Sequence, residues 1–364
     1  MVGLTLRWRA CALATLLLAL HALPADAAKA RAKTPANKQA AAPAAGVLYA
    51  TRPEVMLEAD AIAARRDLDL TWVRQAIGGA RQLPQSARWV LPPPSGTAKN
   101  WRLYRSRFID PVRIAAGVAF WRANAAALER AQSEFGVPAE IIVGIIGVET
   151  IYGRDMGNFR VIDALSTLSF DFPQAHPRAQ ERRTFFLGEL EQLLTLAWRS
   201  GSNPSDFKGS FAGAMGIPQF MPSSWARHAV DFDGDGRIDL FTSSADAIGS
   251  VANYFKAFGW QTGMPTHYAA QFDPATLDLD ALLAPDILPT FSPASMANKG
   301  LVLEPAAAQH AGPLALVELQ NGVSAPSYVV GTENFYVITR YNWSSYYAMA
   351  VIELGQEVAR ARSR

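Results

Sequence analysis

Cysteine is nearly absent from this sequence: Cys11 is the only one among 364 residues. It lies at the start of an N-terminal apolar run that is typical of a removable signal, so the mature chain should contain no thiol. A disulfide, a cysteine nucleophile and a thiolate metal site are therefore excluded from the mature protein. Because a lipid-attachment cysteine would follow the apolar run, Cys11 does not predict a lipid anchor.

Net charge is also small, since 34 lysines and arginines nearly balance 32 aspartates and glutamates, for a formal charge of +2. Nucleic-acid binding needs a concentrated basic patch, and this sequence shows none, so no nucleic-acid partner is predicted. Half of the residues are hydrophobic and 18% are charged, which is ordinary for a globular protein with a sizeable core.

The N-terminus predicts export. Arg7 and Arg9 precede the apolar run from Ala10 to Leu20, and Ala25-Asp26-Ala27 provides a small-x-small cleavage site. A helix needs about 20 apolar residues to span a bilayer, and this run is shorter. We therefore expect a signal peptide at 1–27, cleaved after Ala27 in preference to a retained anchor. The product is then soluble, with no stable membrane anchor.

Beyond the signal, composition and periodicity divide the chain further. Residues 28–46 are rich in alanine, lysine and proline and predict a linker, and residues 47–364 predict one domain. Apolar residues at helical spacing indicate a mainly α fold. The expected helices are Glu54–Ala64, Leu70–Ile77, Ile114–Phe135, Ala139–Val148, Arg182–Trp198, Ser223–Ala229, Ser244–Phe258 and Ser344–Ala361. A smaller mixed α/β insertion is expected at about 259–336, with strands at Leu314–Leu319 and Ser327–Val330.

A carboxylate follows the most apolar of these helices. The run from Ala139 to Val148 (AEIIVGIIGV) is apolar on every side, and Glu149 comes directly after it. Burial disfavours the charged form of a carboxyl group and so raises its pKa. A glutamic acid that stays protonated near neutral pH can give its proton to a glycosidic oxygen. The alternative is a structural glutamate bound by backbone amides or by an arginine such as Arg154.

An acidic loop resembles the calcium loop of an EF-hand. The segment DFDGDGRID places oxygen ligands at positions 1, 3 and 5, glycine at 6 and a backbone carbonyl at 7. The expected ligands are Asp231, Asp233, Asp235 and the carbonyl of Arg237. A structural calcium ion is therefore predicted, and a merely solvated acidic turn is the alternative.

Four segments of the chain resemble the B-type lytic murein transglycosylases, a lysozyme-like family. They are Val137–Gly153 (VPAEIIVGIIGVETIYG), Lys208–Ser224 (KGSFAGAMGIPQFMPSS), Val251–Phe255 (VANYF) and Ile338–Val351 (ITRYNWSSYYAMAV). The resemblance implies a lysozyme-like catalytic core and a periplasmic enzyme of cell-wall turnover that acts on peptidoglycan strands. The expected reaction cleaves the β-1,4 bond between N-acetylmuramic acid and N-acetylglucosamine and forms a 1,6-anhydro ring, without an organic cofactor.

The resemblance also implies roles for individual residues. Glu149 matches the family's single acid/base catalyst. Residues that match substrate-contacting positions are Tyr104, Arg182, Ser210, Gln219, Tyr254, Tyr341, Asn342 and Tyr347. Such residue types suit a sugar, because tyrosines offer a stacking face with a hydroxyl, and neutral amides and hydroxyls offer hydrogen bonds. No second catalytic carboxylate is expected, since Asp155 and Asp163 favour surface or capping roles.

The closing ligand of the calcium loop follows from the family as well. An EF-hand has a bidentate glutamate at position 12, where this sequence has Thr242. The family uses a later aspartate, which is Asp246 here. The spacing Ser243-x-x-Asp246 also fits a helix-capping box, so a capping role for Asp246 remains an alternative.

Two other functions remain open from the sequence. A muramidase would deliver water to the same sugar and leave a reducing end, and a glycan-binding scaffold would keep the cleft without turnover. The products distinguish the three cases. Protein partners are not predicted.

Overall fold

The computed structural model describes residues 46–94 and 96–364. The predicted signal peptide and all but the last residue of the predicted linker lie outside this range. The described chain forms two compact units, one from residues 96–155 and 228–364 and the other from residues up to 94 and 156–227. Among the described residues, no single helix is long and apolar enough to cross a membrane. The helices Ala125–Phe135 and Ala139–Thr150 are together long and apolar enough, but the chain bends by 117° between them.

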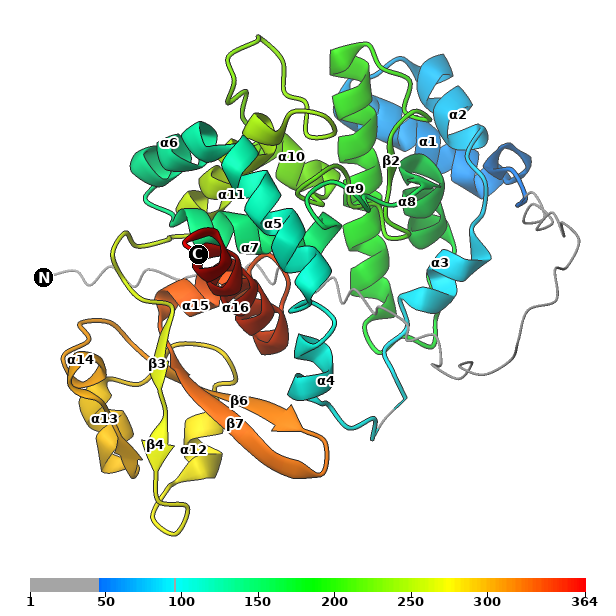
Figure 1. The fold of residues 1–364 in the computed structure, drawn as a ribbon. Helices are drawn as coiled ribbons and strands as arrows, with labels where there is room; N and C mark the ends of the chain where they lie inside the picture. Colours follow the sequence, from blue (N-terminus) through cyan, green and yellow to red (C-terminus); the bar gives the residue numbers. More distant parts are fainter. Residues whose placement is uncertain (1–45, 95) are drawn as a thin grey trace, which may run out of the picture. The chain divides into compact units, whose positions relative to one another are not determined.

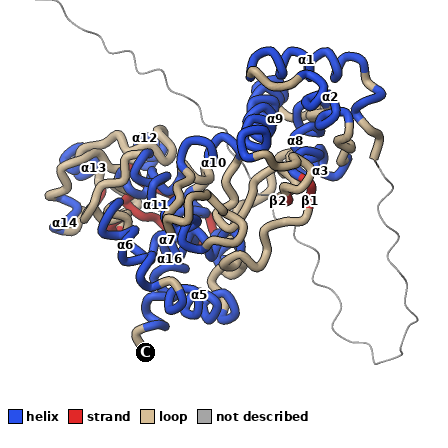
Figure 2. Tube along the Cα trace, turned by 90° about the horizontal axis from the view of Figure 1, so that it is seen from above, coloured by secondary structure: helices blue, strands red, loops and turns tan. Residues whose placement is uncertain are grey.

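The unit that contains residues 156–227 is mainly helical. Helix α9 packs against α8, and α1 packs on α2 and α9 (Figure 2). Its elements are η1 (Tyr49–Thr51), α1 (Pro53–Arg66), α2 (Leu70–Gly78), α3 (Pro84–Trp89), β1 (Phe159–Arg160), α8 (Val161–Phe170), α9 (Ala179–Ser200), β2 (Lys208–Gly209) and α10 (Pro222–His228). Strands β1 and β2 form a short antiparallel pair.

The other unit has a helical core around α7. Helix α16 lies beside α7 and α5, while α6 and α11 pack on α7 (Figure 1). The core elements are α4 (Trp101–Arg105), α5 (Pro111–Ala123), α6 (Ala125–Phe135), α7 (Ala139–Thr150), α11 (Ser244–Ala257), α15 (Glu333–Thr339) and α16 (Ser345–Arg362). The two helices α7 and α16 approach closely because Gly144 faces the backbone of Val351 and Gly355 faces that of Glu140.

A three-stranded antiparallel sheet in this unit has the order β3-β7-β6 and its own small core. The elements here are β3 (His267–Ala269), β4 (Gln271–Phe272), α12 (Leu279–Leu283), α13 (Pro293–Asn298), β5 (Leu301–Val302), α14 (Pro305–Ala308), β6 (Ala315–Asn321) and β7 (Ser324–Gly331). The register pairs Val330 of β7 with Tyr268 and with Leu316. At the β6–β7 turn, Gly322 N–H donates to the carbonyl of Lys99 at 3.0 Å. The hairpin therefore contacts the segment that leads into α4.

The mainly α fold is confirmed, and one predicted helix is wrong. Asp110 caps α5 and Pro111 begins it, as the sequence indicates. The expected single helix Ile114–Phe135, however, is two helices that meet at Asn124, which leaves the helical region with φ −119° and ψ 23°. Asn124 Nδ2 donates to the carbonyl of Phe120 at 2.9 Å. This local side-chain bond competes with the helix and allows the chain to turn.

Candidate active site

Helix α7 buries each of its residues except Glu140 and Glu149. Glu149 lies in the last turn, where its partial exposure leaves it accessible from outside the packed helix. The helix ends because Ile151 and Tyr152 adopt φ values of 50° and 59°. Left-handed backbone is uncommon for any residue with a side chain and rarest for a β-branched one such as isoleucine. The sequence thus places Glu149 directly before a sharply turned, strained segment.

A tyrosine holds the Glu149 carboxyl group. The hydroxyl of Tyr347, at the start of α16, donates to Glu149 Oε1 at 2.5 Å. Burial raises the pKa of Glu149 to about 7, and this hydrogen bond partly opposes the rise. Within the described residues, no ion pair joins Glu149 to Arg154 or to another basic side chain. The alternative of a structural, arginine-paired glutamate therefore finds no support.

Two other predicted tyrosines, Tyr104 and Tyr341, lie near the same carboxyl group, and Tyr254 packs against Tyr341. The Tyr341 ring is nearly parallel to that of Tyr347, with centroids 6.4 Å apart, and Tyr254 lies 4.8 Å from Tyr341. Burial raises the pKa of Tyr104, and the nearby charge of Glu149 raises it further. The same two causes raise the pKa of Tyr341 and of Tyr347. Tyr104, Tyr341 and Tyr347 therefore stay protonated and can donate hydrogen bonds.

Asn342 follows Tyr341 in the turn between α15 and α16. It is 8% exposed, and its Oδ1 has no hydrogen-bond partner among the residues that the structure describes. A buried amide oxygen without a partner costs free energy, and a bound ligand can supply the missing donor. This unit therefore brings together Glu149 and four predicted tyrosines, and it carries Asn342 next to one of them.

Three predicted contact residues belong to the other unit, which is described by itself. Ser210 is buried, and its Oγ accepts the N–H groups of Ala212 and Ala214 at 3.3 and 3.0 Å. Gln219 has φ 51°, and its Nε2 donates to the carbonyls of Met156 and Gly216 at 3.1 and 3.0 Å. Both side chains thus fix the glycine-rich loop, while the serine hydroxyl proton and the glutamine Oε1 are not used in these bonds.

Arg182, the third of these residues, lies on α9. Its guanidinium group packs against Phe185 and Phe186, and burial lowers its pKa to about 10. Nη1 has no hydrogen-bond partner within residues 46–94 and 96–364. A buried guanidinium group that keeps a free donor is suited to a carbonyl or carboxylate ligand.

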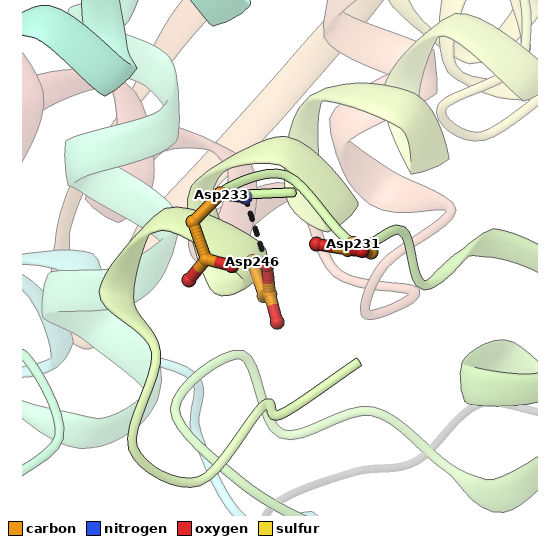
Figure 3. Close-up of side chains that lie close together, drawn as sticks. All are labelled: Asp231, Asp233 and Asp246. Atoms are coloured by element: carbon orange, nitrogen blue, oxygen red, sulfur yellow. Dashed lines mark hydrogen bonds between the residues drawn. The ribbon is translucent and has the colours of Figure 1, made fainter. Parts of the chain in front are cut away.

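The predicted metal loop gathers three carboxylates. Oxygens of Asp231, Asp233 and Asp246 lie within 4.8 Å of one another (Figure 3). No lysine or arginine pairs with these three residues in the described part of the chain. Calcium takes oxygen ligands at 2.3–2.6 Å, so oxygens on opposite sides of one ion are about 5 Å apart. The donor type, the spacing and the uncompensated charge all fit a calcium ion.

Asp246 serves the loop rather than the helix terminus. Its carboxylate accepts the N–H groups of Phe232 and Asp239 at 2.7 and 2.8 Å, and it is 1% exposed. The helix cap comes instead from Ser243, whose Oγ accepts the Asp246 N–H. The capping-box alternative is thus half correct, because the serine caps α11 while the carboxylate turns toward the loop.

Two further predicted calcium ligands lie beside this cluster. Asp235 is outside the group of converging oxygens, and its Oδ1 accepts the N–H of Arg237 at 2.9 Å. The Arg237 side chain is exposed and pairs with Asp235 at 3.4 Å. Their roles as ligands stay predictions.

The sequence did not single out Glu189, a second buried carboxylate. Its two oxygens accept the N–H and the hydroxyl of Ser223 at 2.8 and 2.6 Å and so cap α10. Both oxygens are used, which favours a structural role. A glutamate within an ordinary amphipathic helix gives no local signal that would have identified it.

Comparisons with known proteins show the family of the chain. The model of the transglycosylase SLT domain family matches residues 52–356. Membrane-bound lytic murein transglycosylase B of Escherichia coli K12 is 42% identical over 323 residues, which are 86% of this chain and 85% of that protein.

Two solved structures are similar over most of the chain. The E. coli lytic transglycosylase SLT35 in complex with calcium has a TM-score of 0.74 at 41% identity, covering 88% of this chain and 96% of that one. SltB3 of Pseudomonas aeruginosa in complex with NAG-anhNAM-pentapeptide has a TM-score of 0.67 at 29% identity. The match covers 83% of this chain and 79% of that one. These similarities confirm the predicted fold class.

Proposed function

Since this chain belongs to the transglycosylase SLT domain family, we propose that Glu149 is the single acid/base residue of its reaction. The protein is a lytic murein transglycosylase that acts on peptidoglycan. The observation that carries the proposal is the Glu149 carboxyl group itself, partly exposed at the end of a buried helix and held by Tyr347. Because its pKa is raised to about 7, this carboxyl group can supply a proton near neutral pH.

The proposed reaction uses one carboxyl group twice. Protonated Glu149 gives its proton to the glycosidic oxygen as the bond to the anomeric carbon breaks, and the sugar's own N-acetyl group assists departure. The resulting carboxylate then takes the proton of the 6-hydroxyl while that oxygen bonds to the anomeric carbon. An internal hydroxyl has a high effective concentration, which lowers the entropic part of the barrier. Most glycosidases instead need two carboxylates.

Tyr347 has a defined role in this scheme. Its hydroxyl donates to Oε1 of Glu149, which leaves Oε2 for the transferred proton. The bond also stabilises the carboxylate between the two proton transfers, because hydrogen bonds to a charged group favour that form. Tyr104, Tyr254, Tyr341 and Asn342 are proposed to bind the sugars, and Ser210, Gln219 and Arg182 are proposed further contacts from the other unit.

The products from purified sacculi test the proposal. Ring closure leaves out the water that hydrolysis adds, so the released muropeptides should be lighter by one water than hydrolysis products. Mass spectrometry measures this difference directly. Reducing ends would identify a muramidase, and an intact sacculus would identify a glycan-binding scaffold. The SltB3 complex contains an anhydro sugar, which supports the ring-closing reaction in a relative.

The raised pKa of Glu149 predicts a pH dependence. The acid must be protonated before it can act, so kcat should fall as pH rises through the Glu149 pKa of about 7. Above that value we expect about a tenfold loss per pH unit. Initial rates on purified sacculi across this range measure it. Tyr347→Phe removes a hydrogen bond that lowers the pKa of Glu149, so in this variant the decrease of kcat should occur at higher pH. A decrease at the wild-type pH in this variant would contradict the assignment of Glu149 as the acid.

Calcium is proposed as a structural ion of the loop, with Asp231, Asp233 and Asp246 as carboxylate ligands and Asp235 and Arg237 completing the loop. The ion would offset two of the three neighbouring negative charges and hold the loop that leads into α11. The calcium complex of SLT35 supports this proposal. No catalytic step is assigned to the ion.

Calcium should raise the melting temperature of the purified mature protein. An ion that binds only the folded state adds about 2.7 kcal/mol of stability at a free concentration of 100 Kd. Asp233→Asn should abolish the rise, because it removes one of the three carboxylates. Asp280→Asn, an exposed aspartate on α12, should retain it. Equal melting curves in calcium and in chelator for the wild type would refute the site.

We also propose that the protein is exported to the periplasm, cleaved after Ala27 and released in soluble form. The apolar run and its cleavage site support this proposal. N-terminal sequencing of the mature protein and cell fractionation test it. An acylated N-terminus in the membrane fraction would contradict it.

A further inference from the structure

Arg113, on the first turn of α5, makes contacts at both of the segments that flank the proposed acid. Its side chain is 11% exposed, although it carries a full charge. A guanidinium group loses hydration when buried, and fixed partners must replace it. Each of its partners therefore shows what the side chain holds in place.

One partner is the last turn of α7. Arg113 Nε donates to the carbonyl of Gly147 at 3.0 Å, two residues before Glu149. The same carbonyl also accepts the N–H of Ile151 at 3.3 Å, where the chain turns into left-handed backbone. A cation at the C-terminal end of a helix interacts favourably with the helix dipole and with its last carbonyls. Arg113 thus stabilises the turn that orients Glu149.

The other partners lie in the segment between α4 and α5. Arg113 Nη1 donates to the carbonyl of Arg107 at 2.5 Å and pairs with Asp110 Oδ2 at 3.0 Å. The guanidinium group also lies over the Phe108 ring, whose centroid is 5.0 Å from that of Tyr104. This segment therefore holds Tyr104, which lies within the electrostatic field of Glu149.

We propose that Arg113 is a positioning residue that joins the α7 turn carrying Glu149 to the segment between α4 and α5, whose Phe108 contacts Tyr104 of α4. The proposal rests on the proposed function of Glu149. Burial raises the pKa of Glu149 and the Tyr347 hydrogen bond lowers it, and the charge of Arg113 is not among the causes of the shift. Arg113 therefore acts through geometry rather than by tuning the acid.

Arg113→Lys tests the role, because lysine keeps the charge but cannot hold two segments with a rigid fork of donors. A misplacement of about 1 Å at a catalytic group costs about 10²-fold in rate, so we expect kcat to fall by about 10- to 100-fold. KM for glycan strands and the pH midpoint of kcat should stay at their wild-type values. Kinetics are measured well below the melting temperature of each variant.

Arg52→Lys is the matched control. Arg52 also lies over an aromatic ring, that of Tyr49, and pairs with the carboxylate of Asp171 at 2.6 Å. The substitution Arg52→Lys should lower the melting temperature and leave kcat unchanged. If Arg113→Lys has a normal kcat, or if its loss of kcat matches that of Arg52→Lys at equal destabilisation, the positioning role is refuted.

A double-mutant cycle with Tyr104→Phe tests whether Arg113 aligns Tyr104 with Glu149 or only stabilises the fold. If Arg113 acts through the alignment of Tyr104 with Glu149, Arg113→Lys should cost less in the Tyr104→Phe background than in the wild type. If the losses of kcat in the two single variants simply multiply in the double variant, the proposal is contradicted. Failure of the acid assignment is a different result, because it would appear as normal turnover in Glu149→Gln with no change at Arg113.

Discussion

Glu149→Gln should lower turnover on purified sacculi by about 10²–10⁴-fold, the contribution of general acid–base catalysis. Glutamine keeps the shape of the side chain and can still accept the Tyr347 hydroxyl at its amide oxygen, but it has no proton of suitable acidity to transfer. Glycan binding should persist, because the tyrosines and Asn342 are unchanged. The measurements are initial rates of muropeptide release and sedimentation with sacculi.

The stability of this variant is the main control. The folded pKa of Glu149 is raised above the ordinary value of 4.5 to about 7, so wild-type stability falls as pH rises through this interval. Glutamine cannot ionise, so the variant should melt at the same or a higher temperature than the wild type at pH 8. Asp155→Asn and Asp163→Asn should retain much of the activity. Near-normal turnover in Glu149→Gln would falsify the acid/base assignment.

Gly144→Ala should severely destabilise the unit that contains α7 and α16. A Cβ atom at this position would lie 2.2 Å from the carbonyl oxygen of Val351, which is backbone and cannot rotate away. Overpacking typically costs about 1–3 kcal/mol, and a rigid backbone neighbour favours the upper end. Because α7 carries Glu149 and α16 carries Tyr347, kcat should fall as well. Urea denaturation followed by fluorescence measures the loss.

Gly188→Ala is the matched control for this substitution. Gly188 also lies within a helix, α9, but no atom is within 4 Å of its Cβ position. Replacement of an unhindered helical glycine by alanine should stabilise by about 0.5–1 kcal/mol. The same chemical change thus has opposite expected signs at the two sites. Destabilisation of equal size at both would mean that the α7–α16 contact is not the cause.

Local pattern allowed much of the fold to be predicted. The all-apolar run of α7 and the Asp110-Pro111 start of α5 depend on neighbouring residues, and both lie where the sequence indicates them. The break at Asn124 was missed because apolar spacing continues across it, while a single side-chain hydrogen bond decides the turn. The short helices α12 to α14 were also missed, since their proline-rich segments resemble loops.

The candidate site shows the same division. Glu149 could be identified from its position after an apolar run, because burial and a raised pKa follow from local sequence. The contact between Tyr347 and Glu149 could not be derived from pattern, since it depends on how α16 packs against α7. The roles of Arg113 and Glu189 gave no signal, because they depend on the distant carbonyl of Gly147 and on the distant Ser223. The direction of the Asp246 side chain likewise required the folded loop.

The hydrogen bond between Tyr347 and Glu149 also sets the order in which the site can form. Its two residues are 198 positions apart, and Tyr347 lies in the last helix of the chain. During synthesis the acid is therefore present long before the hydroxyl that holds it. Contacts between residues so distant in the chain form slowly, because a long loop must close first. A nascent chain that ends before α16 thus contains Glu149 without its partner, and the pair is completed only when α16 is available to fold.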